Sequence, residues 1–452
     1  MPGFGAPVVA AAGTRMLRLL LLIPTTTYRT EDFVAAATKL DVELVVASER
    51  PNVLEAALPD NLLTLDFGDP HKAARTVAEF ARRHPVDAVV PVDDRTTVVA
   101  AAIAERLGLR SSPLDAVSTT RNKHRMREAF ARAGVRSPRF ARLDVSDDPE
   151  AAASRMTYPC VLKPTILAAS RGVIRADDPP SFVAAFRRIE GILRAPDVAG
   201  LGEGREEVLV EDFIPGDEVA LEGLLVRGEL YVLALFDKPD PLDGPYFEET
   251  IYVTPSRLPP DVQVSVAAET RWAARALGLT EGPIHAELRL NEQGPWVVEV
   301  AARTIGGLCS RTLRFGAGLS LEEVVIRHAL GIELDSLERE RRPAGVMMLP
   351  IPGAGVLRAA RGREAALAVP GIEEVTISAH VGQELVPLPE GSRYLGFIFG
   401  RADSPEAVEE ALRAAHRRLE FDVEPPGPAA PAGVAPSPTS QESPEPTEEP
   451  CR

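Results

Sequence analysis

Residues 282–307 read GPIHAELRLNEQGPWVVEVAARTIGG, and this stretch has the pattern of a β-hairpin. In residues 284–290, apolar side chains alternate with His285, Glu287 and Arg289, which is typical of a half-buried strand. A three-residue turn over 292–294 would end at Gly294, where a positive φ is needed. A second strand then covers 295–301, and in this register Glu287 faces Glu299.

Two directly opposed carboxylates repel each other unless a cation lies between them. Mg²⁺ accepts one or two carboxylates together with phosphate oxygens, so Glu287 and Glu299 predict a metal site. The alternative is a pair of solvated glutamates on an open face. Behind the second carboxylate, Arg303, Gly306 and Gly307 supply a cation and two small residues, which suits a second anionic group bound close to the backbone.

The chain strongly prefers arginine to lysine, and its only lysines are Lys39, Lys72, Lys123, Lys163 and Lys238. Lys39 and Lys72 fall on predicted helix faces. An ammonium group can reach a phosphate where a planar guanidinium does not fit. Lys163 ends a predicted strand and precedes a turn of small residues, an arrangement that suits a polyphosphate. For Lys123 and Lys163 the alternative is a solvated side chain. The turn consists of Ser170, Arg171, Gly172 and Val173.

Residues 211–218, EDFIPGDE, connect two predicted strands. The apolar part of this connector would offer backbone donors and acceptors to the edge of an adenine ring. The carboxylate that follows, Glu218, would reach ribose hydroxyl groups. An acidic β-turn without a ligand is the alternative interpretation.

The N-terminal region alternates apolar runs with helical stretches, which predicts a parallel α/β sheet. The expected strands cover 17–23, 42–47, 62–65 and 88–91, and the expected helices cover 31–40, 70–84 and 96–107. Asp93 and Asp94 follow the last strand, where they would either meet a ligand or cap a helix. No GxGxxG motif follows the first strand, so a dinucleotide fingerprint is absent.

The rest of the chain predicts two further domains and two loose ends. One long helix is expected over 115–133, and it leads into a region rich in β structure. The expected divisions are a leader at 1–15, domains at 16–113, 114–335 and 344–421, and a Pro- and Glu-rich disordered tail at 424–452. Within the second domain, a lid is expected over about 156–225. In the third, Ser404 and Pro405 predict the start of a closing helix.

Composition restricts the class of protein. The 452 residues carry a net charge of −16, with 45% hydrophobic and 26% charged residues, as in a globular protein. This acidic balance argues against general binding of nucleic acid. The apolar run at 17–23 is too short to span a membrane. Three widely spaced cysteines predict no disulfide framework and a reducing, cytoplasmic compartment.

Together these motifs resemble the ATP-grasp superfamily of carboxylate–amine ligases, over about residues 122–331. The hairpin and residues 387–398 are similar to the L-amino acid ligases of the bacilysin-synthetase type, which form dipeptides. The resemblance implies a fold that combines α/β and α+β parts. It would have a Rossmann-like N-terminal domain, a central ATP-grasp lid and core, and a small C-terminal α+β domain. Two departures are Ala301, where most members place an asparagine ligand, and a glycine-poor loop at 165–169.

The resemblance also implies a role for each matching residue. Glu287 and Glu299 would bind Mg²⁺ or Mn²⁺, and Arg303, with Gly306 and Gly307, would hold the reacting carboxylate. Asp94, Glu249 and His285 are weaker candidates for contact with the substrate. The residues that would contact ATP are Lys123, Lys163, Ser170, Arg171, Gly172, Val173, Glu211, Asp212, Phe213, Ile214 and Glu218.

The activity implied is ATP-dependent ligation, in which an amino acid carboxylate becomes an acyl phosphate and is joined to an amine, with release of ADP and phosphate. The expected partners are these small molecules, without nucleic acid or membrane, in a chain that forms a homodimer. Two alternatives stay open. One is another ATP-grasp reaction, such as carboxylation or a purine-pathway ligation. The other is a catalytically silent ATP-binding regulator.

Overall fold

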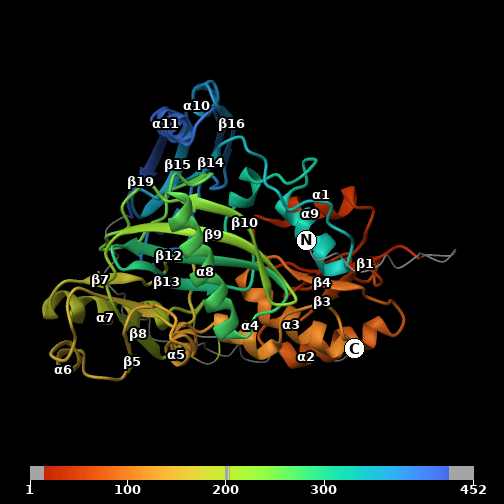
Figure 1. Cartoon of the computed structure of the whole chain (residues 1–452), viewed down its shortest axis with the longest axis horizontal. Helices are drawn as coiled ribbons and strands as arrows, with labels where there is room; N and C mark the ends of the chain where they lie inside the picture. Colours follow the sequence, from red (N-terminus) through yellow and green to blue (C-terminus); the bar gives the residue numbers. More distant parts are fainter. Residues whose placement is uncertain (1–14, 199–201, 203, 427–452) are drawn as a thin grey trace, which may run out of the picture.

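The computed structural model describes residues 15–198, 202 and 204–426 (Figure 1). Nearly all of the expected leader and tail lies outside these residues. The N-terminal domain has the expected parallel sheet, in the order β3-β2-β1-β4, with helices packed on it. Its elements are β1 (Arg18–Leu22), α1 (Thr30–Lys39), β2 (Glu43–Ser48), β3 (Leu62–Thr64), α2 (Pro70–Ala81), β4 (Ala88–Pro91), η1 (Asp94–Thr96) and α3 (Thr97–Leu107).

The single helix expected over 115–133 is instead two helices, so that prediction was wrong. They are α4 (Leu114–Thr120) and α5 (Lys123–Ala133). The break lies at Asn122, whose extended backbone and side-chain oxygen, which accepts the Arg125 N–H, cap the second helix. As a result, Lys123 is the first residue of α5, and its backbone N–H donates to the Thr165 carbonyl at 2.8 Å.

A small antiparallel sheet follows, with the strand order β5-β8-β6-β7, and we call it the small sheet. Its apolar residues pack against a long helix, α7, whose buried face includes Phe182, Phe186 and Ile189. In Figure 1 this unit lies to one side of the central strands. Its elements are β5 (Phe140–Asp144), α6 (Pro149–Ala153), β6 (Cys160–Pro164), β7 (Ile174–Ala176), α7 (Pro179–Leu193) and β8 (Glu207–Asp212).

An eight-stranded sheet, here the central sheet, has the order β13-β12-β9-β10-β11-β14-β18-β16. Strands from the last part of the chain therefore continue the sheet of the middle part, through the pairing of β11 with β14. The helix α9 packs beside α1 of the N-terminal domain (Figure 1). The elements from the middle of the chain are β9 (Asp217–Val226), β10 (Glu229–Asp237), β11 (Ile251–Thr254), α8 (Pro260–Leu277), β12 (Gly282–Asn291), β13 (Gly294–Ala301), η2 (Cys309–Thr312) and α9 (Leu321–Leu330).

The last part of the chain adds a second, three-stranded sheet in the order β17-β15-β19. Its closing helix, α11, starts as predicted, since the Ser404 side chain accepts the Ala407 N–H and Pro405 is the first helical residue. The elements are β14 (Ala344–Leu349), β15 (Gly355–Arg361), α10 (Arg363–Leu367), β16 (Ile372–Ile377), β17 (Glu384–Leu385), β18 (Gly396–Arg401), α11 (Pro405–His416) and β19 (Glu420–Glu424).

The β12–β13 hairpin brings Glu287 opposite Glu299, as predicted, but by a different route. The turn has two residues rather than three, because Asn291 pairs with Gly294. That shorter turn would shift the register by one, and a bulge beside Glu287 shifts it back. The expected three-residue turn was therefore wrong, while the facing of the two carboxylates is confirmed.

Candidate active site

A cavity of about 650 Å³ is lined by residues of the N-terminal domain, the small sheet and the central sheet. Of the residues to which the sequence analysis gave a site role, all but Gly172 line it. The Gly172 N–H donates to the Pro389 carbonyl at 2.9 Å. The predicted residues that do line the cavity are Asp94, Lys123, Lys163, Ser170, Arg171, Val173, Glu211, Asp212, Phe213, Ile214, Glu218, Glu249, His285, Glu287, Glu299, Arg303, Gly306 and Gly307.

Two lysines stand at one end of the cavity, each beside a carboxylate. The Lys123 ammonium donates to the Leu167 carbonyl at 2.7 Å and lies 3.3 Å from Glu299. The Lys163 ammonium lies 2.6 Å from the buried Glu211 carboxylate, which also forms an ion pair with Arg127 at 2.6 Å. The Glu211 side chain is therefore occupied by two cations rather than directed to a base. Burial alone would raise the pKa of Glu211, but these two cations lower it below its usual value.

The connector after β8 presents an aromatic ring between two guanidinium groups. The Arg175 and Arg289 guanidinium carbons lie 4.2 and 4.9 Å from the centroid of the Phe213 ring. The backbone N–H groups of Asp212 and Phe213 donate to carbonyls of Arg139 and Pro159. The positions of Phe213 and of its two cationic neighbours are thus fixed by the protein itself.

The loop before β7 is held in an unusual backbone conformation. Ala169 and Ser170 have positive φ values of 54° and 55°, as does Gly172 at 75°. A Cβ on Gly172 would also lie 2.7 Å from the Pro164 ring. The next residue along the chain from Ser170, Arg171, forms an ion pair with Asp197 at 2.5 Å. This loop is poor in glycine, as the sequence indicated. The Arg171–Asp197 ion pair and the hydrogen bond from Gly172 to Pro389 hold it in place.

A cluster of three carboxylates surrounds Lys238, a lysine to which the sequence analysis assigned no role. The buried Lys238 ammonium lies 2.7 Å from Glu218, 2.5 Å from Glu249 and 3.5 Å from Glu287. Although burial opposes its charge, these carboxylates raise the pKa of Lys238 well above its usual value. Tyr252 donates its hydroxyl to Glu249 at 2.7 Å. Glu218 and Glu249 therefore bind an internal cation in this structure.

The donor set of this region fits a divalent cation. Oxygens of Glu218, Glu249 and Glu287 lie within 4.8 Å of one another. These carboxylates outnumber the ammonium group between them, so the cluster keeps an excess of negative charge. Lys238 and His285 lower the pKa of Glu287 against the effect of burial, so this carboxylate is ionised at neutral pH. Hard oxygen ligands of this kind are those that Mg²⁺ prefers.

His285 connects this cluster to the loop that follows the hairpin. Its Nδ1 lies 2.5 Å from the buried Glu222, and its Nε2 lies 3.3 Å from Glu287. Glu222 also accepts the Ile305 N–H at 3.0 Å. Burial disfavours the charged imidazolium, but Glu222 and then Glu287 raise the pKa of His285 to about 9. Glu222 was not predicted as a site residue. Side chains alternate along β9, so Glu222 lies on the same face of the strand as Glu218, and this alternation was the signal that could have found it.

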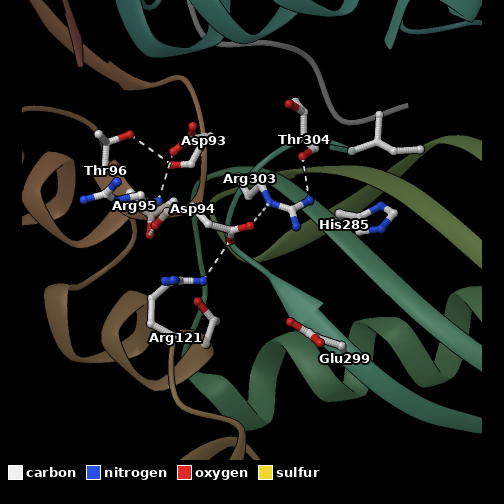
Figure 2. A network of polar contacts seen from close by, with 12 residues as sticks. Asp93, Asp94, Arg95, Thr96, Arg121, His285, Glu299, Arg303 and Thr304 are labelled. Carbon is white, nitrogen blue, oxygen red and sulfur yellow. Dashed lines mark hydrogen bonds and ion pairs between the residues drawn. The ribbon is translucent and has the colours of Figure 1, made fainter. Parts of the chain in front are cut away.

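Arg303 follows the end of β13 by two residues and forms a network with the N-terminal domain (Figure 2). Its Nε donates to Asp94 at 2.9 Å, and Arg121 approaches the other oxygen of Asp94 at 3.1 Å. Burial would raise the pKa of Asp94, but Arg303 and Arg121 lower it to about 2. The neighbouring Asp93 caps η1 by accepting the Arg95 N–H. The capping interpretation is therefore confirmed for Asp93, whereas Asp94 pairs with two arginines of the protein itself.

Beyond Arg303 the cavity wall becomes apolar. A Cβ on Gly307, whose φ is +59°, would lie 2.9 Å from the Phe397 ring. Phe397 also packs edge-on against Tyr28 at a centroid distance of 5.7 Å. Cys309 is buried and unpaired to another cysteine, and it lies 3.8 Å from the Met348 sulfur. Tyr28, Gly307, Cys309 and Met348 line the cavity here, and Phe397 packs behind them.

Comparison with known proteins agrees with this arrangement. Three family models match: the ATP-grasp N-terminal domain over residues 34–110, the ATP-grasp domain over 156–312, and L-amino acid ligase C-terminal domain 2 over 347–424. The structure of an L-amino acid ligase from Bacillus licheniformis superimposes with a TM-score of 0.76 at 26% identity, covering 91% of this chain and all of that chain.

Two curated relatives are named as a ligase and a synthase. Alanine–anticapsin ligase of Bacillus subtilis is 28% identical over 263 residues, which are 55% of this chain and 55% of the relative. Dapdiamide A synthase of Enterobacter agglomerans is 28% identical over 261 residues, 56% of this chain and 60% of the relative. The chain spans little more than half the length of these relatives.

None of the helices among residues 15–198 and 204–426 is both long and apolar enough to cross a membrane.

The family matches follow the order of the three parts of the chain, and the solved ligase aligns with 91% of this chain. The chain therefore carries an ATP-grasp N-terminal domain, an ATP-grasp domain and an L-amino acid ligase C-terminal domain in that order, and its fold is similar to that of an L-amino acid ligase.

Proposed function

We propose that the chain is an ATP-dependent carboxylate–amine ligase, which joins an amino acid or a related acid to an amine, in the simplest case a second amino acid. One observation carries the proposal. A single cavity brings together two lysines, Lys123 and Lys163, the opposed carboxylates Glu287 and Glu299, and Arg303. The match to an L-amino acid ligase C-terminal domain supports amino acids as substrates.

In this proposal each end of the cavity has its own task. Lys123 and Lys163 bind the ATP phosphates under the 170–173 loop. Residues 212–214 face the nucleobase, and Glu218, one oxygen of which pairs with Lys238, faces the ribose. Glu287 and Glu299 would hold Mg²⁺ or Mn²⁺, which when bound neutralises phosphate charge. Arg303, with Gly306 and Gly307, holds the carboxylate that reacts. The apolar wall beyond Gly307 accommodates a substrate side chain.

The chemistry needs no nucleophile from the protein. A carboxylate is a poor electrophile, so its oxygen first attacks the γ-phosphorus of ATP, and ADP leaves. The amine then attacks the carbonyl carbon of the acyl phosphate, loses a proton, and expels inorganic phosphate. Phosphoryl transfer depends mainly on alignment and on neutralising charge. The fixed cations of Lys123, Lys163 and Arg303 supply both in a site lined by protein.

The proposal is tested by a two-dimensional screen of amino acids and small acids against amines, measured by ADP release and product mass. We expect ADP release only when an acid and an amine are both present. ATP binding without turnover over the whole panel would favour the silent regulator instead. ADP release with bicarbonate in place of an organic acid would favour a carboxylation reaction. A cytoplasmic location and a homodimer belong to the same proposal and rest on composition and family resemblance.

A further inference from the structure

Asp94 is the one carboxylate of the N-terminal domain that bonds directly to Arg303 among the described residues (Figure 2). It belongs to η1, just after β4, at the carboxyl end of the parallel sheet. Its Oδ2 accepts from Arg303 Nε at 2.9 Å, and its Oδ1 lies 3.1 Å from Arg121. With both oxygens engaged by protein cations, Asp94 has little capacity left for a substrate ammonium group.

The same contacts fix the orientation of the Arg303 guanidinium. Arg303 Nη1 donates to the Thr304 carbonyl at 2.8 Å, while Asp94 holds Nε on the other edge. Thr304 is itself fixed, because its hydroxyl accepts from Arg29 at 2.7 Å, and Arg29 donates to the Val92 carbonyl at 3.1 Å. Among the described residues, no hydrogen-bond partner is found for Arg303 Nη2, and Arg303 lines the cavity.

We propose that Asp94 and Arg121 are positioning residues for Arg303, and that Asp94 does not contact the substrate. Asp94 fixes the guanidinium so that its free edge meets the reacting carboxylate, and Arg121 holds Asp94 in place. This inference rests on the proposed function, and it assigns Asp94 a different role from the substrate contact suggested by its sequence position. It also means that the N-terminal domain completes a site whose other groups lie on later parts of the chain.

A purely structural role, in which Asp94 only docks the N-terminal domain, is the competing explanation. Docking does not depend on Asp94 alone, because other ion pairs cross the same boundary. Asp32 of α1 bonds to Arg311 of η2 at 3.0 Å, and Lys39 of α1 bonds to Glu323 of α9 at 3.0 Å. Neither pair lines the cavity. Asp32→Asn is therefore a matched control, since it removes a charge at the same boundary away from the site.

The experiment compares Asp94→Asn with Asp32→Asn by steady-state kinetics on the acid substrate, after thermal unfolding shows that both variants are folded. We expect Asp94→Asn to lower kcat about tenfold or more, because a misplaced guanidinium lowers the rate of the chemical step. The KM for the acid should not rise, since removing a carboxylate beside Arg303 makes its surroundings more positive. Asp32→Asn should leave both constants within about twofold.

Equal losses of kcat in the two variants would overturn the positioning role, and so would a raised KM for the acid at unchanged kcat in Asp94→Asn. If Asp94→Asn does not fold, Arg121→Gln replaces it, since this change removes only the second anchor of Asp94. A smaller loss of kcat is then expected, and an unchanged kcat would contradict the proposal. If the wild type is active and Asp94→Asn behaves like Asp32→Asn, this inference alone is rejected. If the wild type is itself inactive across the screen, the proposed function is rejected as well.

Discussion

At the level of single residues, the cavity is an assembly of charges that hold one another in place. Lys163 and Arg127 share Glu211, Lys238 lies among three glutamates, and Arg303 bonds to Asp94. Because each buried charge has an opposite partner, the cations and carboxylates are fixed before any ligand binds. Preorganised charge of this kind is the main way in which enzymes stabilise phosphoryl transfer.

Glu299→Gln tests the metal role of the hairpin. The amide keeps the size of the side chain but removes the negative charge that would bind the cation. We expect Mg²⁺-dependent ADP formation to fall about 100-fold or more, while the unfolding temperature changes little. Rates of ADP release at several Mg²⁺ concentrations measure the effect. Turnover close to that of the wild type would show that Glu299 is not a metal ligand.

Lys163→Ala tests the phosphate role, with Lys72→Ala as the control. Lys163 is buried beside Glu211, which keeps its ion pair with Arg127 after the change. Lys72 is exposed on α2 and lies 3.8 Å from Asp66. A charged hydrogen bond to phosphate is worth about 1.5–3 kcal/mol, so Lys163→Ala should weaken ATP binding roughly tenfold or more. Calorimetric titration with ATP measures both variants, and equal affinities would discredit the assignment.

The raised pKa of His285 predicts a pH dependence of stability. The folded protein holds this proton up to about pH 9, while the unfolded chain releases it near 6.5. The stabilisation is therefore complete below pH 6.5 and is lost as the pH rises through 9. It amounts to about 3 kcal/mol. Urea unfolding of metal-free protein between pH 6.5 and 9 should show this loss in the wild type, and a similar slope in His285→Gln would argue against it.

Candidate site residues could be predicted where a local sequence pattern marks them. They could not be predicted where their position depends on a contact with a residue far away in the chain. The alternation of β12 and the scarcity of lysine identified Glu287, Lys163 and Lys123. Arg127 and Arg121 looked like ordinary helix arginines, because their partners Glu211 and Asp94 are far away in the chain. The role of Lys238 likewise depends on three carboxylates that only the folded sheet assembles.

At the level of helices and strands, the hairpin shows how a correct contact can follow from an incorrect turn. The opposition of Glu287 and Glu299 was predictable from the side-chain period of two. The bulge that restores this register was not, since its extra residue is Val298, whose carbonyl accepts from Arg127 of a distant helix. The expected helix over 115–133 failed for a local reason, because its periodicity runs through the Asn122 cap without interruption.

Leu412→Ala tests the packing of α11 on the extended central sheet. Leu412 is fully buried, and α11 covers β14 and β18. Removing its side chain should lower the free energy of unfolding by about 2–5 kcal/mol, whereas Leu367→Ala on α10 should cost far less because Leu367 is 42% exposed. Chemical denaturation measures both. Similar losses in the two variants would mean that α11 is not packed as described.

At the level of the whole molecule, the site forms where separate parts of the chain meet. The N-terminal domain contributes Asp94, the small sheet contributes Lys163, and the central sheet contributes Glu287, Glu299 and the segment leading to Arg303. The order of these parts was predictable from strand and helix patterns. The joining of β14 to β11 was not, because strands so far apart carry no pairing signal in one sequence. The cavity therefore depends on the assembly of the N-terminal domain, the small sheet and the central sheet.

The central claim is that this cavity activates a carboxylate as an acyl phosphate and passes it to an amine. The most direct measurement uses an acid–amine pair found by the screen, with ¹⁸O in both oxygens of the acid. Mass spectrometry of the released phosphate should find one ¹⁸O atom for each amide bond formed, because the carboxylate oxygen that attacks ATP leaves with the phosphate. Amide product accompanied by phosphate that carries no label from the acid would contradict the account.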